Sequence, residues 1–184
     1  MLDKETVNRI QGFVDDAMMQ TDAIPQPAVN VEKMAKTLGF AVRRLVLNLP
    51  NVIGLMVIDA MDEQMKKKAG SDKLIALNNR YDEPHLRFAI AHEIGHYFMH
   101  NSECKKGTNP VYFTQIEDNE EGIEEEACRF AAMLLMDKAK FQEAYENLKS
   151  NRALREIDVI RELAQLFAVP QKAVQRRIGE LADE

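Results

Sequence analysis

The stretch IAHEIGHYFMH, residues 90–100, places His92, Glu93 and His96 in the order H-E-x-x-H. Pro84 can begin a helix that runs through this stretch to about residue 100. Because an α-helix advances about 100° per residue, His92 and His96 lie on the same face, one turn apart. Two imidazoles in that arrangement can bind one metal ion.

Glu93 lies about 100° around the helix from His92, next to the face of the histidines. Its carboxylate cannot easily bind the same ion, but it can reach a water molecule beside the ion, which is the position of a general base. The opposite side of the helix is apolar: Ile90, Ala91, Ile94 and Phe98. We therefore expect that side to be buried, and the His and Glu side chains to face a cleft or solvent.

Gly95 lies inside this predicted helix, where glycine costs about 1 kcal/mol relative to alanine. A close approach of another backbone, or of a substrate, would explain it.

The same spacing also fits a solvated polar stripe, and a third ligand distinguishes the two interpretations. Zinc needs three protein ligands if one position is to stay open for water. His100 lies about 12 Å along the helix axis from His92, too far for His92, His96 and His100 to bind one ion. We assign His100 a supporting or packing role and expect the third ligand on another element.

An acidic cluster, Glu124, Glu125 and Glu126, opens the next predicted helix. On a helical projection, Glu124 falls within the apolar arc of that helix, whereas Glu125 and Glu126 fall outside it. A carboxylate on a core-facing stripe is costly unless it is paired or binds a metal, so Glu124 is the candidate third ligand. The favourable position of acids at a helix N-terminus accounts for the other two.

The rest of the chain predicts an α+β fold with a small antiparallel or mixed sheet before the motif helix. Helices are expected over residues 3–20, 29–38, 84–100 and 123–148, and strands over residues 40–47, 52–59 and 73–79. Polar loops are expected over residues 62–72 and 101–122. Two shorter helices follow residue 152. We expect two units, a main domain at residues 1–150 and a C-terminal helical extension at residues 151–184.

The composition of the 184 residues, 46% hydrophobic and 29% charged, is typical of globular proteins. The first twenty residues have no unbroken apolar run, which argues against a signal peptide or membrane anchor. Only Cys104 and Cys128 occur, so we expect no disulfide framework and a cytoplasmic location. The formal net charge of −6 disfavours broad affinity for nucleic acid.

Two segments, RFAIAHEIGHYFMH at 87–100 and EEEACRFAAMLLM at 124–136, resemble the ImmA/IrrE family of zinc metallopeptidases. The resemblance implies a zincin-like minimal metallopeptidase domain that holds one Zn²⁺ per chain through His92, His96 and Glu124, with Glu93 as catalytic base. The sequence departs from the family pattern at Cys128, where Asn or Asp is usual, and at Asp137, where Pro is usual. The first departure bears on catalytic competence, because a polar side chain there can orient a ligand.

The best-known members of that family cleave helix-turn-helix repressors and so induce mobile-element or stress-response genes. The resemblance implies a zinc-dependent endopeptidase whose protein substrate is such a repressor. The oxyanion that forms during cleavage needs a donor, and the candidates are Tyr81, Tyr97, His100 and Tyr112. We expect the substrate chain to add as a strand beside residues 73–79.

Residues 157–182 have the helix, turn and helix spacing of helix-turn-helix modules. Lys172, Arg176 and Arg177 offer a basic face, but from Arg152 onward six basic residues are balanced by six acidic ones. We therefore expect these helices to dock on the main domain or on a partner protein, and direct DNA binding not to be their role. A DNA-binding regulator and a catalytically silent repressor-binding module remain the alternative functions.

Overall fold

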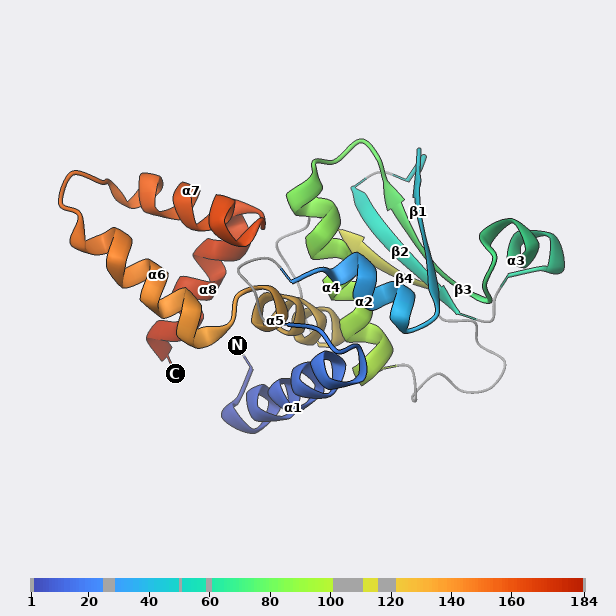
Figure 1. Ribbon diagram of the computed structural model, residues 1–184, viewed down its shortest axis with the longest axis horizontal. Coiled ribbons are helices and arrows are strands. Elements are labelled where there is room, and N and C mark those ends of the chain that lie inside the picture. The colour runs from blue at the N-terminus through green and yellow to red at the C-terminus, as the bar shows by residue number, and fades with distance from the viewer. Residues whose placement is uncertain are drawn as a thin grey trace.

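The computed structural model describes residues 2–24, 29–49, 51–58, 61–100, 111–115 and 122–183. Its helices are α1 (Lys4–Gln20), α2 (Val31–Thr37), α3 (Glu63–Ala69), α4 (Glu83–Met99), α5 (Ile123–Leu135), α6 (Lys138–Ser150), α7 (Glu156–Phe167) and α8 (Gln171–Asp183). Its strands are β1 (Phe40–Leu45), β2 (Val52–Ile58), β3 (Lys73–Asn78) and β4 (Val111–Gln115). Figure 1 shows α4 and α5 between the sheet and the C-terminal helices, with α3 at the opposite end of the molecule.

The four strands form one mixed sheet in the order β1-β3-β2-β4. β1 is parallel to β3, with Phe40 opposite Lys73, whereas β2 is antiparallel to both β3 and β4. The expected α+β class with a small mixed sheet is confirmed. The expected substrate-binding edge at residues 73–79 is wrong, because β3 is hydrogen-bonded on both sides and the edges are β1 and β4.

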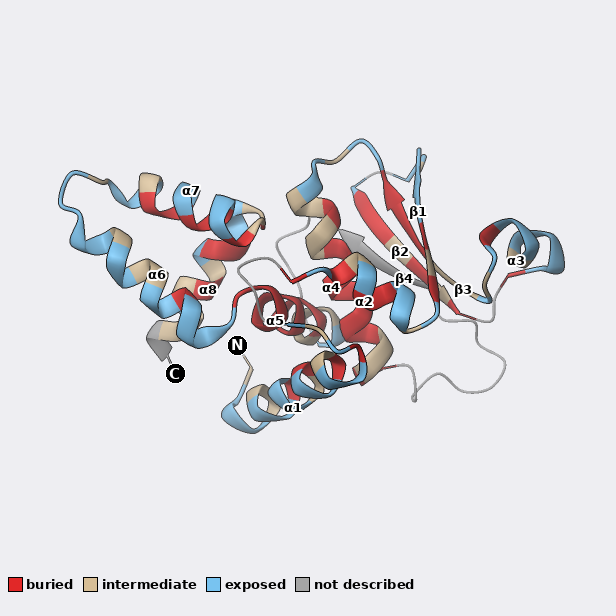
Figure 2. Ribbon diagram, viewed as in Figure 1, coloured by how far each residue is buried: buried red, intermediate tan, exposed pale blue. Residues whose placement is uncertain are grey.

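Helix α4 begins where Asp82 accepts a hydrogen bond from the backbone N–H of His85, with Pro84 in the first turn. It packs closely on the sheet: a Cβ at Gly54 of β2 would lie 3.2 Å from the Cβ of Ala89. Figure 2 shows that α4 and α5 are the most extensively buried helices. His92, Glu93 and His96 are themselves buried, so this side of α4 does not face solvent, and a cleft beside it stays a prediction.

Two segments expected as loops contain regular structure. Within residues 62–72, Asp62 accepts a hydrogen bond from the N–H of Met65 at the start of α3, and Gly70 ends that helix at φ 75°. Strand β4 lies within the second segment, residues 101–122, and pairs with β2. Capping therefore starts a helix in the first polar segment, whereas β4 is formed by five mostly β-branched and aromatic residues, VYFTQ, within the second.

The helix expected over residues 123–148 is two helices, α5 and α6. Met136 leaves the helical conformation at ψ 75°, and the side chain of Asp137 accepts a hydrogen bond from the N–H of Lys140. An aspartate at this position caps the next helix, which explains the break.

The C-terminal helices pack on the rest of the chain through one buried arginine, Arg129, and shared apolar residues. Arg129 of α5 pairs with Glu180 of α8 at 2.6 Å, and the same carboxylate lies 3.4 Å from Arg177. Residues on both sides of position 150 belong to one apolar cluster, including Phe141 and Phe167. The division of the chain into residues 1–150 and 151–184 stays a prediction.

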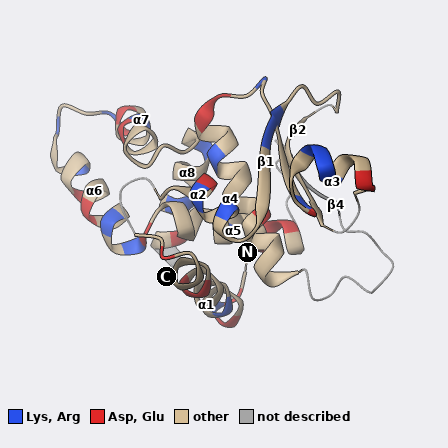
Figure 3. Cartoon of the chain, turned by 45° about the vertical axis from the view of Figure 1, so that its right-hand side comes forward, with Lys and Arg blue, Asp and Glu red and all other residues tan. Residues whose placement is uncertain are grey.

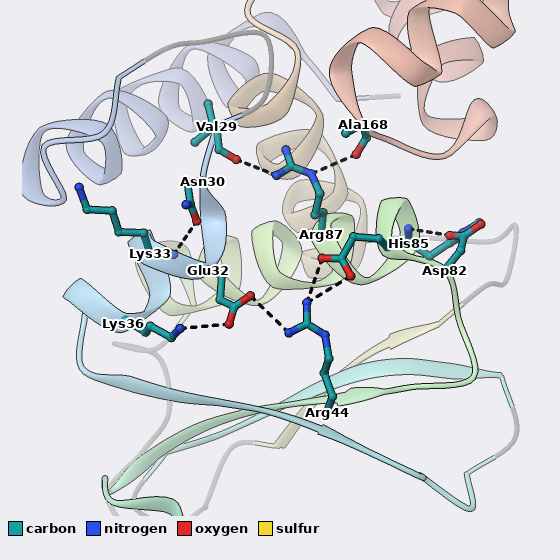
Figure 4. A network of polar contacts seen from close by, with 11 residues as sticks. Val29, Asn30, Glu32, Lys33, Lys36, Arg44, Asp82, His85, Arg87 and Ala168 are labelled. Atoms are coloured by element: carbon teal, nitrogen blue, oxygen red, sulfur yellow. Dashed lines mark hydrogen bonds and ion pairs between the residues drawn. The ribbon is translucent and has the colours of Figure 1, made fainter.

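Arg87 of α4 connects three separate parts of the chain (Figure 4). Its guanidinium donates to the carbonyl oxygen of Val29, before α2, at 3.0 Å, and to that of Ala168, between α7 and α8, at 3.1 Å. Below it, Arg44 of β1 pairs with Glu83 at 2.9 Å and with Glu32 at 3.4 Å. These contacts fix the N-terminal half of α4 against α2, β1 and the C-terminal helices.

Charged residues of both signs lie on the helices in view, and Lys66, Lys67 and Lys68 follow one another on α3. Figure 3 shows Lys and Arg interspersed with Asp and Glu on α1 and α6. Among the described residues, no helix is both long enough and apolar enough to cross a membrane.

Candidate metal centre

Close packing of α4 against α5 brings the acidic start of α5 to the motif histidines. A Cβ added at Gly95 would lie 3.0 Å from the ring of Phe130 on α5. The close neighbour that explains this glycine is therefore an aromatic side chain, where we had expected another backbone or a substrate. Any larger residue at position 95 would push the two helices apart.

His92, His96 and Glu124 converge on one point. Their ligand atoms all lie within 4.8 Å of one another. The Nε2 atoms of His92 and His96 are 3.0 Å apart, and they lie 3.1 and 3.3 Å from the two carboxylate oxygens of Glu124. Ligand atoms around one tetrahedral zinc, with bonds of about 2 Å, are about 3.4 Å apart, so small shifts would accommodate the ion.

The protonation states of these groups suit metal binding. Burial lowers the pKa of His96 to about 4, so the imidazole is neutral near pH 7. Burial raises the pKa of Glu124, but hydrogen bonds from His92 and His96 outweigh this effect and lower it to about 2. A neutral imidazole and an ionised carboxylate are the forms that bind zinc.

Glu93 is fully buried beside His92 on α4. A carboxylate in such a position is costly unless charged or polar groups compensate it. Its place directly after His92 on α4 keeps it as the candidate for a group that exchanges protons with a reacting water molecule.

A family model described as the IrrE N-terminal-like domain, a peptidase family, matches residues 51–179 of the chain. The match covers more than half of the sequence and contains α4, α5 and the three convergent residues. The chain belongs to the ImmA/IrrE family. No curated protein matches the sequence.

At the position where the ImmA/IrrE pattern usually has Asn or Asp, Cys128 contacts the first histidine. Its Sγ lies 3.3 Å from Nδ1 of His92, on the side of the ring away from Glu124. The residue is buried, and it has the neighbour expected for a side chain that orients a ligand. Sulfur is a weak acceptor, so this support is weaker than an amide or carboxylate oxygen would give.

The second histidine of this ImmA/IrrE site is supported by another histidine. Nδ1 of His100 lies 3.0 Å from Nδ1 of His96, and Nε2 of His100 lies 3.2 Å from a carboxylate oxygen of Glu126. The other oxygen of Glu126 accepts a hydrogen bond from Arg9 of α1 at 2.5 Å. The supporting role expected for His100 agrees with this geometry.

Sequence reasoning missed Glu126 and Arg9. The helical projection placed Glu126 outside the core-facing arc, yet its side chain is only 17% exposed because α1 covers it. The two residues are 117 positions apart in the sequence. Only the packing of α1 on α5 brings them together, so no local pattern could have indicated the pair.

The structure reduces the number of candidate oxyanion donors. The hydroxyl of Tyr97 lies 3.0 Å from Nζ of Lys73 on β3, and both ring nitrogens of His100 have protein partners. Tyr81 packs near His85, at the first turn of α4. The side chain of Tyr112 lies outside the described residues, although its backbone, in β4, pairs with Met56 of β2.

Proposed function

We propose that this chain is a zinc-dependent endopeptidase, with His92, His96 and Glu124 as ligands and Glu93 as catalytic base. The observation that supports it best is the convergence of three ligand atoms from α4 and α5 within a family of peptidases. One Zn²⁺ held by these residues would polarise the peptide carbonyl and activate a water molecule for attack.

Two further roles, proton transfer and stabilisation of the oxyanion, are proposed for side chains of the chain. Glu93 takes the proton of the attacking water on its carboxylate and passes it to the leaving amine nitrogen. Tyr112, in the edge strand β4, stays the proposed donor to the oxyanion. The substrate is proposed to be a protein. The chain is proposed to act in the cytoplasm.

We propose a helix-turn-helix repressor as that protein substrate. The C-terminal helices are proposed to support the peptidase and not to read DNA: of their candidate reading residues, Arg177 is only 1% exposed and contacts Glu180. A catalytically silent repressor-binding module is the second candidate, favoured by the cysteine that supports His92 where an amide or carboxylate is usual.

Proteolysis is tested with zinc-loaded protein, a peptide mixture from a digested bacterial proteome and a panel of purified helix-turn-helix repressors. New peptide termini are identified by mass spectrometry. Wild type should generate them, whereas Glu93→Gln should not. Glu63→Gln, on α3 and 93% exposed, should cleave like wild type.

Equal cleavage by wild type and Glu93→Gln would refute the proposed base. No cleavage of either substrate pool by zinc-loaded wild type would favour the silent binding module.

A further inference from the structure

We infer that His100, Glu126 and Arg9 form a hydrogen-bonded relay that holds the ring of His96 in the orientation and tautomer needed to bind metal. The inference rests on the proposed metal site and adds three positioning residues to it. It also makes α1, which lies outside the segment matched by the family model, part of the metal centre.

The distances admit one assignment of protons when His96 binds metal. Nε2 of His96 faces His92 and Glu124 and must be unprotonated to act as a ligand. Its proton is then on Nδ1, which donates to Nδ1 of His100 across 3.0 Å. His100 consequently carries its own proton on Nε2 and donates it to Glu126 across 3.2 Å.

With these protons, each N–H of His96 and His100 in the relay has an acceptor, and the last acceptor is the carboxylate of Glu126. Hydrogen bonds that end on a carboxylate are stronger than those between neutral groups, and neighbouring bonds polarise one another at a buried site. His96 and His100 are both buried, at 0% and 4% exposure. The relay therefore restricts the rotation of the His96 ring and increases the electron density at Nε2.

The arginine fixes the end of the relay. Arg9 donates to one oxygen of Glu126, which leaves the other oxygen directed at His100. Because α1 packs on both α4 and α5, this contact links three helices at one carboxylate. Arg9 is half exposed, so its own contribution is smaller than that of Glu126.

The two histidine ligands are consequently supported unequally. His92 has a sulfur atom behind it at 3.3 Å, whereas His96 has a ring nitrogen backed by a carboxylate and a guanidinium. We infer that this chain relies more on the support of His96 than on that of His92.

The test measures zinc affinity by competition with a chromophoric chelator in the full chain. His100→Ala and Glu126→Ala should weaken binding by about 10- to 100-fold, the usual effect of losing such support. His100→Gln should recover much of the affinity, because the glutamine carbonyl can accept from His96 while its amide donates to Glu126. Arg9→Gln should cause a smaller loss, and Glu125→Ala, at the neighbouring acid, should bind like wild type.

A spectroscopic signature separates positioning from general destabilisation. In ¹⁵N-histidine-labelled, zinc-loaded protein, the Nδ1 proton of His96 should be protected from exchange in wild type and His100→Gln, and exchange rapidly in His100→Ala. Circular dichroism verifies that each variant is folded.

Wild-type affinity in folded His100→Ala and Glu126→Ala would overturn the relay and leave the metal site in place. If Arg9→Gln alone bound zinc as tightly as wild type, Arg9 and α1 would make no contribution to the relay. Failure of wild type to bind zinc would overturn the proposed metal site itself, and the relay with it.

Discussion

Cys128 of α5 lies directly behind His92, with its Sγ 3.3 Å from Nδ1 of that ring. The side chain thus occupies the position of a supporting acceptor but offers only sulfur. This contact lies at the point where the chain departs from the usual ImmA/IrrE pattern.

Replacing this thiol by an amide should strengthen the metal site. In Cys128→Asn, the side-chain oxygen can accept the Nδ1 proton of His92 better than sulfur does, so zinc affinity should rise by up to about tenfold. Cys128→Ala should change the affinity little, because the bond that it removes is weak. Chelator competition measures both variants, and folded Cys128→Asn that binds zinc no more tightly than wild type would refute the expectation.

The contact between Gly95 and Phe130 predicts that the helix pair tolerates no added side chain. Gly95→Ala places a Cβ 3.0 Å from the aromatic ring, and overpacking of this kind costs about 1–3 kcal/mol of unfolding free energy. The intrinsic gain of alanine in a helix, up to about 1 kcal/mol, offsets part of the loss.

Gly12→Ala is the matched control, since a Cβ at Gly12 of α1 meets nothing within 4 Å. It should stabilise the protein by up to about 1 kcal/mol. Urea denaturation of both variants compares the two sites, and equal stabilisation by both would contradict the packing argument.

The metal-free protein should lose stability in acid, beginning near pH 6.5. His96 has a pKa of about 4 in the fold against an ordinary 6.5, so the unfolded chain binds its proton first as the pH falls. Stability should therefore decrease by about 3 kcal/mol between these two pH values. The pKa of Glu124, lowered from 4.5 to about 2, should extend the decline to lower pH.

Urea denaturation of metal-free protein at a series of pH values measures this decline. His96→Gln removes the titrating group and should flatten the upper part of the curve. A wild-type stability that is constant from pH 6.5 to 4.5 would contradict the buried neutral state of His96.

Arg87 should contribute to stability through the two carbonyl groups that it joins. Arg87→Met keeps the aliphatic bulk but leaves the oxygens of Val29 and Ala168 without this donor, at a cost of about 2–3 kcal/mol. Hydrogen exchange in α7 and α8 should also accelerate. Arg80→Met, at an exposed position, is the control and should be neutral; unchanged exchange in Arg87→Met would show that the contact does not hold the C-terminal helices.

The parts of the site that helical geometry determines could be predicted from the sequence. One turn separates His92 from His96 on α4, and the arc of α5 selected Glu124, so the three residues could be named before their distances were known. The same reasoning failed for Glu126, since a helical projection considers one helix and α1 covers this side chain from outside.

Fold features that depend on strand pairing were predicted less well. The strand predicted over residues 73–79 corresponds to β3, but its place between β1 and β2 depends on long-range hydrogen bonds. Strand β4 has only five residues; its β-branched and aromatic composition, VYFTQ, is typical of a strand, but its pairing with β2 depends on long-range hydrogen bonds. In contrast, α3 and the break at Asp137 follow from helix caps that are visible in the sequence, Asp62 and Asp137.

The most direct test of the proposed site is the metal content of untagged protein, measured by elemental mass spectrometry for wild type, Glu124→Ala and Glu125→Ala. The account predicts about one zinc per chain in wild type and in Glu125→Ala, and none in folded Glu124→Ala. Zinc retained by Glu124→Ala, or none bound by folded wild type after zinc is supplied, would contradict it.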